Sequence, residues 1–268
     1  MTKKTEQKRG ILLVAFGTSH SEAAIVFEHI ENRVKIEFPD AEVHWAYTSK
    51  IIRKILSARG RHINSPSQAL AKMGDEGFTH VAVQSLHIVP GEEYDNLKLT
   101  VQAFKKIPKA LAAVELGTPL LFLHTDIQKM AAIVHQTFGK YTDNSSVLIL
   151  MGHGTSHASN VFYPGFQYYL SKKSDSYFMA TIDGYPELRH IVPDLKKKGI
   201  KKVTLAPFLS VAGDHAKNDM AGKGEHSWKS ILLKEGFVVD IIQKGLAEYQ
   251  EVVNIWLEHL KVAYSKLR

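Results

Sequence analysis

The stretch Ser146-Val-Leu-Ile-Leu-Met-Gly-His-Gly-Thr-Ser-His157 decides the fold. Its apolar run, residues 147–151, is short and rich in β-prone side chains, which predicts a buried strand. Gly152-His-Gly154 ends that strand, and Thr155 and Ser156 offer hydroxyls that we expect to cap a following helix. A strand that stops at His153 before a helix places an imidazole at the carboxyl edge of a parallel sheet, where open α/β sheets bind ligands. The alternative is an ordinary strand-to-helix turn that contains a histidine.

Outward from this stretch, predicted strands and helices alternate along the chain. The strands are expected at 11–16, 42–47, 80–86, 111–116, 147–151, 177–182, 202–209 and 238–242. The helices are expected at 22–37, 48–59, 65–76, from the loop 88–94 to 105, and at 126–138, 158–172, 186–198, 227–234 and 246–267. Regular alternation of this kind predicts an α/β protein with parallel sheets that carry helices on both faces.

An internal repeat divides the chain. Residues 11–20 match residues 148–157 at an offset of 137 through the shared Gly-Thr-Ser-His, with Phe16 opposite His153. Residues 77–93 match residues 199–215 at an offset of 122, with Glu93 opposite His215. Two copies of one strand–helix unit indicate two similar domains that face each other.

Composition limits the function. The chain has 268 residues, of which 44% are hydrophobic and 23% charged, as in globular proteins. It contains no cysteine, which excludes disulfides, thiolate metal sites, iron–sulfur clusters and cysteine nucleophiles. Without a membrane-spanning run or a signal-peptide pattern, we expect a cytoplasmic protein. The formal net charge of +7 favours an acidic small molecule over nucleic acid, because no basic stripe is interleaved with aromatic residues.

Four polar residues follow predicted strands. If the halves face each other, Glu93, His153, Asp183 and His215 all point into one cleft, where imidazole and carboxylate suit Co²⁺, Ni²⁺, Fe²⁺ or Zn²⁺. Each has a simpler interpretation: Asp183 as the cap of a helix that begins at Pro186, Glu93 as a first-turn acid, and His215 as a turn residue. Phosphate-loop, dinucleotide and nucleophile-elbow motifs are missing from the sequence.

Taken together, the motifs resemble the anaerobic cobaltochelatases of cobalamin biosynthesis (CbiK type), which are class II tetrapyrrole chelatases. The resemblance covers nearly the whole chain and is carried by residues 14–19, 46–49, 51–54, 84–88, 91–94, 151–154, 184–187 and 211–220. It implies two flavodoxin-like halves, 1–125 and 126–245, that face a central tetrapyrrole cleft, with the C-terminal helix 246–268 packing back on the first half.

The resemblance also implies a reaction, the insertion of Co²⁺ into sirohydrochlorin without a permanently bound cofactor. It makes His153 and His215 metal ligands, His153 also the proton acceptor, and Glu93 an acidic residue of the cleft. Asp183 stands where the family usually carries a glutamate ligand, which shortens the reach of the carboxylate by one methylene. A neutral imidazole, with an unperturbed pKa of about 6.5, is a suitable acceptor for the two pyrrole protons that the macrocycle loses.

Two other functions stay open at the level of sequence. One is the insertion of Fe²⁺ or Ni²⁺ into a related tetrapyrrole, and the other is a non-catalytic tetrapyrrole or haem carrier. The two histidines and two carboxylates favour catalysis, because a carrier needs at most two axial ligands. No nucleic acid or membrane partner is expected, and the oligomeric state, a homo-oligomer included, is left open.

Overall fold

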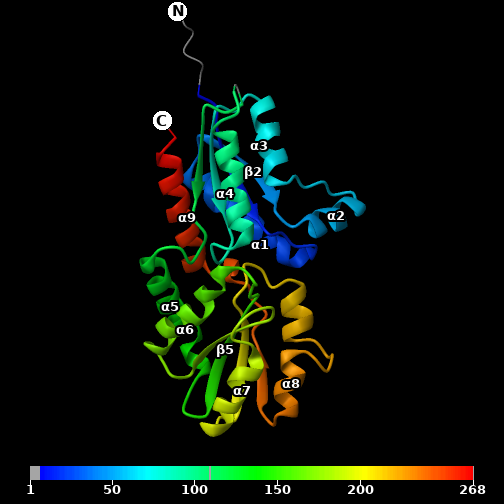
Figure 1. The fold of residues 1–268 in the computed structure, drawn as a ribbon, viewed down its shortest axis with the longest axis vertical. Helices are drawn as coiled ribbons and strands as arrows, with labels where there is room; N and C mark the ends of the chain where they lie inside the picture. Colours follow the sequence, from blue (N-terminus) through cyan, green and yellow to red (C-terminus); the bar gives the residue numbers. More distant parts are fainter. Residues whose placement is uncertain (1–6, 109, 268) are drawn as a thin grey trace, which may run out of the picture. The chain divides into compact units, whose positions relative to one another are not determined.

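A computed structural model describes residues 7–108 and 110–267, which form two compact units (Figure 1). Unit 1 is Met1–Leu120 together with Val253–Arg268, and unit 2 is Leu121–Val252. The charged N-terminal residues 1–6 lie outside the described residues. Within the described ranges, no helix is both long and apolar enough to cross a bilayer.

Unit 1 contains four strands and the helices around them. In chain order these are β1 (Arg9–Ala15), α1 (Ser21–Glu37), β2 (Ala41–Tyr47), α2 (Lys50–Ala58), α3 (Pro66–Asp75), β3 (His80–Ser85), α4 (Glu92–Phe104) and β4 (Ala113–Gly117). The C-terminal helix α9 (Gln250–Ser265), red in Figure 1, belongs to this unit from Val253 onward. The Trp256 indole donates to the His87 carbonyl oxygen at 3.4 Å, and Lys261 pairs with Glu37 of α1.

Unit 2 repeats this plan. Its elements are α5 (His124–Phe138), the 3₁₀ turn η1 (Gly139–Tyr141), β5 (Ser146–Gly152), the 3₁₀ turn η2 (Ala158–Val161), α6 (Phe162–Ser171), β6 (Tyr177–Thr181), α7 (Leu188–Lys197), β7 (Lys202–Pro207), the π-helical turn η3 (Ala216–Met220), α8 (Trp228–Lys234), β8 (Val238–Ile241) and the 3₁₀ turn η4 (Leu246–Glu248).

The two sheets have the same topology, β2-β1-β3-β4 and β6-β5-β7-β8, and every strand pair is parallel. The prediction of an α/β fold with two similar parallel-sheet domains is therefore confirmed. The strand order reverses between β1 and β3 in one sheet and between β5 and β7 in the other. Open α/β sheets bind ligands at the carboxyl ends of the strands on either side of this reversal.

The repeat found in the sequence recurs in the backbone hydrogen bonds. In unit 1, the Leu86 amide donates to the Val14 carbonyl oxygen at 2.8 Å. In unit 2, the equivalent residues make the same bond: the Phe208 amide (offset 122 from Leu86) donates to the Met151 carbonyl oxygen (offset 137 from Val14) at 2.7 Å. Gly17 and Gly154 both adopt positive φ, +101° and +81°. The chain crosses from strand to loop in the same way in both units, as expected of a duplication.

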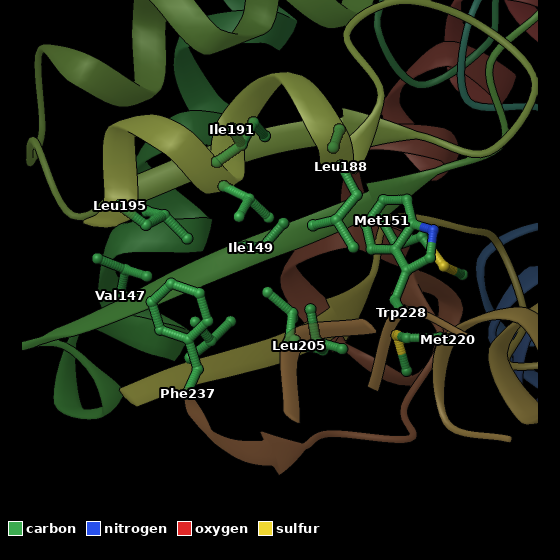
Figure 2. Packing of buried hydrophobic residues seen from close by; sticks show 14 of the residues in the cluster. Val147, Ile149, Met151, Leu188, Ile191, Leu195, Leu205, Met220, Trp228 and Phe237 are labelled. Atoms are coloured by element: carbon green, nitrogen blue, oxygen red, sulfur yellow. The ribbon is translucent and has the colours of Figure 1, made fainter. Parts of the chain in front are cut away.

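Buried side chains on both sheet faces explain why β5 reads as one continuous apolar run. Ile149 and Met151 belong to a core that Leu188 of α7, Trp228 of α8 and Leu205 of β7 complete (Figure 2). Because side chains alternate along a strand, Leu148 and Leu150 face the opposite side, and both are fully buried. A strand buried on both faces is typical of a parallel sheet between two helix layers.

Three local predictions were wrong. Thr155 and Ser156 do not cap the helix after β5: His157 is the N-cap, its ring Nδ1 accepting from the Ser159 amide at 3.2 Å, and a 3₁₀ turn precedes α6. Pro186 does not begin α7, which starts at Leu188.

The third wrong prediction was a continuous helix over 246–267. The 3₁₀ turn η4 and an extended Tyr249 (φ −100°, ψ 119°) separate the first residues of this stretch from α9. Apolar periodicity persists through such a break, because Leu246 and Ala247 of η4 are also buried, so the pattern alone does not show the break.

Candidate metal and proton-transfer site

His153 lies directly after β5, in a loop held against the neighbouring loop after β6. Its carbonyl oxygen accepts hydrogen bonds from the Ile182 and Asp183 amides at 3.1 and 2.8 Å. These bonds extend the parallel pairing of β5 and β6 by one step beyond the sheet. The backbones on which His153 and Asp183 stand are therefore fixed relative to each other within unit 2.

The glycine after His153 is required by this close approach. A Cβ on Gly154 would lie 2.5 Å from the Gly184 amide nitrogen and 2.8 Å from the Asp183 carbonyl carbon. The positive φ of Gly154 is also a conformation that other residues adopt at a cost of about 1–2 kcal/mol. The Gly-His-Gly pattern thus lets two ligand-bearing loops touch, which is a stronger reason for the glycine than a simple strand stop.

Asn160 joins the same two loops from outside the sheet. Its side-chain oxygen accepts from the Thr155 amide at 3.2 Å, and its Nδ2 donates to the Tyr185 carbonyl oxygen at 2.8 Å. One amide side chain therefore bonds the loop after β5 to the loop after β6. Asn160 carried no signal in the sequence, because its two partners are 5 and 25 residues away.

His215 is placed by a one-turn π-helix after β7. It is the N-cap residue of Ala216–Met220, and its Nδ1 lies 2.6 Å from Oδ2 of Asp219. Short π-helical turns are rare and occur frequently at functional sites. Asp219 lies in the motif 211–220, for which the sequence predicted no separate role; its i,i+4 spacing from His215 is the one local sign of the pair.

The two histidines meet. Their ring centroids are 4.7 Å apart in an edge-to-face arrangement, and Nδ1 of His153 lies 4.0 Å from Oδ2 of Asp183. Three of the four predicted site residues are thus neighbours within unit 2. Their side chains are 45%, 38% and 62% exposed for His153, His215 and Asp183, so solvent and substrate can reach them.

Hydrogen bonds determine which ring nitrogen carries the proton. Nδ1 of His153 lies 3.0 Å from the Gly154 carbonyl oxygen, and Nδ1 of His215 faces the Asp219 carboxylate. Because carbonyl and carboxylate oxygens only accept, a neutral ring at either position carries its proton on Nδ1 and leaves Nε2 as a bare lone pair. Both imidazoles are therefore held in the form that binds a metal ion or accepts a proton through Nε2.

The three side chains do not form a complete set of metal ligands. Among residues 7–108 and 110–267, no three His, Asp or Glu side chains are grouped closely enough to hold an ion by themselves. Asp183 does not cap α7 either, because that helix has Glu187 as its N-cap. An open pair of imidazoles with a nearby carboxylate suits an ion that is delivered to a substrate rather than retained.

Glu93 lies in unit 1, as the second residue of α4, with Gly91 as the N-cap. Three acids lie in the first turn of that helix, where the helix dipole favours negative charge: Glu92, Glu93 and Asp95. Glu93 is therefore a first-turn acid of α4, and its predicted place in the cleft stays a prediction.

Among the described residues of unit 1, the corresponding sheet edge has no exposed imidazole pair. Phe16, opposite His153 in the repeat, is 46% exposed, whereas His87 after β3 is buried. Desolvation lowers the pKa of His87 to about 4, and its ring nitrogens contact Ser85 and Thr48 at 2.8 and 3.4 Å. After duplication, the two units have thus diverged, with the histidine pair in unit 2 and an apolar residue in the equivalent place of unit 1.

Comparison with known proteins points in one direction. A family model described as cobalt chelatase (CbiK) matches residues 9–265. The sirohydrochlorin cobaltochelatase CbiKC of Nitratidesulfovibrio vulgaris is 39% identical over 262 residues, which cover 97% of this chain and 92% of the relative. The sirohydrochlorin cobaltochelatase of Salmonella typhimurium is 32% identical over 260 residues, which cover 96% of this chain and 97% of the relative.

Solved structures share the fold. SirB from Bacillus subtilis with Fe³⁺ has a TM-score of 0.67 at 14% identity, covering 97% of this chain and 96% of that one. The sirohydrochlorin chelatase SirB in complex with cobalt has a TM-score of 0.61 at 13% identity, with the same coverage.

Proposed function

We propose that this chain, which belongs to the cobalt chelatase (CbiK) family, inserts Co²⁺ into sirohydrochlorin, with the metal ion and the tetrapyrrole both as substrates. The observation that carries the proposal is the pair of imidazoles of His153 and His215, 4.7 Å apart and each bonded through Nδ1 to an oxygen acceptor. Both rings thereby present Nε2 on an exposed surface at the carboxyl edge of a sheet.

In the proposed mechanism, His153, His215 and Asp183 replace water around the incoming Co²⁺. Two neutral imidazoles leave the double charge of the ion uncompensated, and the Asp183 carboxylate supplies one negative charge nearby. The carboxylate is one methylene shorter than glutamate, so it contacts the ion loosely and releases it readily. We assign these three residues as metal-binding.

Proton removal is the second half of the reaction. The macrocycle loses two pyrrole protons as the metal enters, and a neutral imidazole within hydrogen-bond reach is the acceptor that this chemistry needs. We assign His153 to this role from the resemblance to the cobaltochelatases; as in His215, its Nδ1 is bonded to an oxygen acceptor, which leaves Nε2 to accept the proton. Glu93, a half-buried acid of unit 1, is proposed from the same resemblance as an acidic residue that takes part in the reaction.

A steady-state metallation assay tests the function. Absorption of sirohydrochlorin is followed after addition of Co²⁺, Fe²⁺, Ni²⁺ or Zn²⁺ to the wild type and to His153→Ala and His215→Ala. We expect the fastest turnover with Co²⁺ and a loss of roughly 10²-fold or more in either variant, the scale for removing a positioned base. His226→Ala is the matched control, since that side chain is 94% exposed on another loop of unit 2.

The outcomes separate the alternatives. Wild-type turnover in both histidine variants would refute the assignment of the site. Faster turnover with Fe²⁺ or Ni²⁺ than with Co²⁺ would identify a different metal for the same chemistry. A stable spectrum of bound tetrapyrrole without metallation by any ion would identify a carrier.

A further inference from the structure

The connection between β2 and α3 in unit 1 contains a helix that unit 2 lacks. Residues 48–65, with α2 inside them, join β2 to α3, whereas residues 182–187 make the equivalent join from β6 to α7. The helices α3 and α7 match at the repeat offset of 122, so the two connections begin and end at corresponding places. Unit 2 shows that this fold closes without α2, and Figure 1 shows α2 at the periphery of unit 1, beside one end of α1.

The insert is strongly basic. It carries Lys50, Arg53, Lys54, Arg59 and Arg61, and the chain contains no Asp or Glu from residue 43 to residue 74. In the described part of the chain, none of these five cations forms an ion pair with a carboxylate. Residues 48–65 alone have a formal net charge of +5, compared with +7 for the whole chain.

This charge pattern does not serve the stability of α2. Three of the cations lie in the first five residues of the helix, and its first turn has no acid, although the positive end of a helix dipole favours acids there. Only Leu56 of α2 is buried, while Ile51 is 71% exposed. A helix with few core contacts and unfavourable charges is better explained by a ligand than by folding.

The insert begins at the ligand-binding edge of the sheet of unit 1. The Thr48 amide donates to the Ala15 carbonyl oxygen at 3.0 Å, and the Ser49 amide donates to that of Phe16 at 3.2 Å. The start of α2 is therefore bonded to the loop after β1, beside the exposed Phe16. In addition, the Nε of Arg53 is buried and has no hydrogen-bond partner, so a donor is held in place without an acceptor.

We propose that residues 48–65 are a docking site for the carboxylates of a flat, polycarboxylate tetrapyrrole. Exposed Ile51 and Phe16 offer apolar contact to the macrocycle, and the five cations match anionic groups around its rim. The proposal rests on the proposed chelatase function and adds the residues that recognise the acidic periphery of the substrate.

The test measures binding without turnover. Metal-free porphyrins bearing eight carboxylates or two carboxylates are titrated by fluorescence into the wild type and into a triple variant, Arg53→Gln with Lys54→Gln and Arg61→Gln. We expect the dissociation constant for the eight-carboxylate porphyrin to rise roughly two- to fivefold per cation, or about 10- to 100-fold in the triple variant. The rise should be much smaller for the two-carboxylate porphyrin, and raising the salt concentration should weaken wild-type binding more than variant binding.

The control keeps the net charge equal. Lys173→Gln with Lys197→Gln and Lys201→Gln removes the same three charges from exposed positions of unit 2. The α2 substitutions lie on half-buried or exposed side chains, and melting curves check that both triple variants fold.

Three results overturn the docking site: equal porphyrin affinity in the wild type and the α2 variant, an equal loss in the control, or an equal loss for both porphyrins. Binding to phosphatidylglycerol vesicles that depends on the α2 cations, with porphyrin affinity unchanged, would assign the insert to a membrane surface and also overturn it. If the wild type metallates nothing but binds the eight-carboxylate porphyrin through α2, the chelatase function fails and the docking site is supported.

Discussion

Replacing Asp219 tests how the site holds His215. The carboxylate accepts from Nδ1 of His215 at 2.6 Å across one π-helical turn, and the side chains of the two residues are 38% and 45% exposed. A hydrogen bond to a charged group contributes about 1.5–3 kcal/mol when buried, and exposure of this degree reduces it to about 1 kcal/mol. The Asp219→Ala variant should therefore fold.

The larger effect is on the ring. Without Asp219, the neutral His215 ring is free to carry its proton on Nε2 and to rotate, and both changes remove the lone pair that faces the substrate. Loss of such a supporting carboxylate typically costs 10- to 100-fold in metal affinity or activity. We expect that range for Asp219→Ala, and a smaller loss for Asp219→Asn, whose side-chain oxygen still accepts from Nδ1.

Two measurements separate positioning from loss of structure. Metallation rates give the activity, and ¹H–¹⁵N correlation spectra of the His215 ring report which nitrogen carries the proton. Asp214→Ala is the matched control, because that acid lies on the same loop but accepts from Asn218 at 2.9 Å. Wild-type activity in Asp219→Ala, or a ring still protonated at Nδ1 alone, would refute the reasoning.

Two further predictions concern Asp183 and His87. Asp183→Glu should tighten Co²⁺ binding, and Asp183→Ala should weaken it. Neither change should alter the melting temperature, because Glu187 and not Asp183 caps α7. Calorimetric titration and melting curves check both variants, and a lower melting temperature with unchanged Co²⁺ affinity would contradict the assignment. Burial lowers the pKa of His87 to about 4, so between about pH 6.5 and 4 the unfolded chain binds a proton that the folded chain does not. The free energy of unfolding should therefore decrease by about 3 kcal/mol as the pH is lowered from 6.5 to 4. Denaturant unfolding at several pH values should show this component in the wild type and lack it in His87→Gln; equal pH profiles would rule it out.

The sequence alone was sufficient for the fold class, the internal repeat and the family. Buried parallel strands are continuous apolar runs, and the glycines that end them are required by backbone geometry, so both signals are local. The resemblance to cobaltochelatases, carried by motifs around His153 and His215, is confirmed by the matching family model and the relatives. These same motifs placed His153, Asp183 and His215 after strands, where the structure brings them together.

Boundaries and partnerships needed the tertiary structure. The capping prediction for Thr155 failed because its hydroxyl accepts from the His157 amide at 3.0 Å within the loop, and His157 begins the next turn. The role of Asp219 was hidden because its i,i+4 spacing from His215 is equally typical of any exposed helix surface.

Tertiary structure also decided which charges are satisfied. The basic stretch of residues 50–61 reads as an ordinary solvated helix, and only the positions of the carboxylates elsewhere in the chain show that its cations have none as partners. Likewise, nothing near His87 in sequence predicts the hydrogen bond that its carbonyl oxygen accepts from Trp256, 169 residues away. Apolar periodicity and glycine positions act over a few residues and can be read along the chain, whereas hydrogen-bond partners, burial and charge neutralisation depend on which distant segments the fold brings into contact.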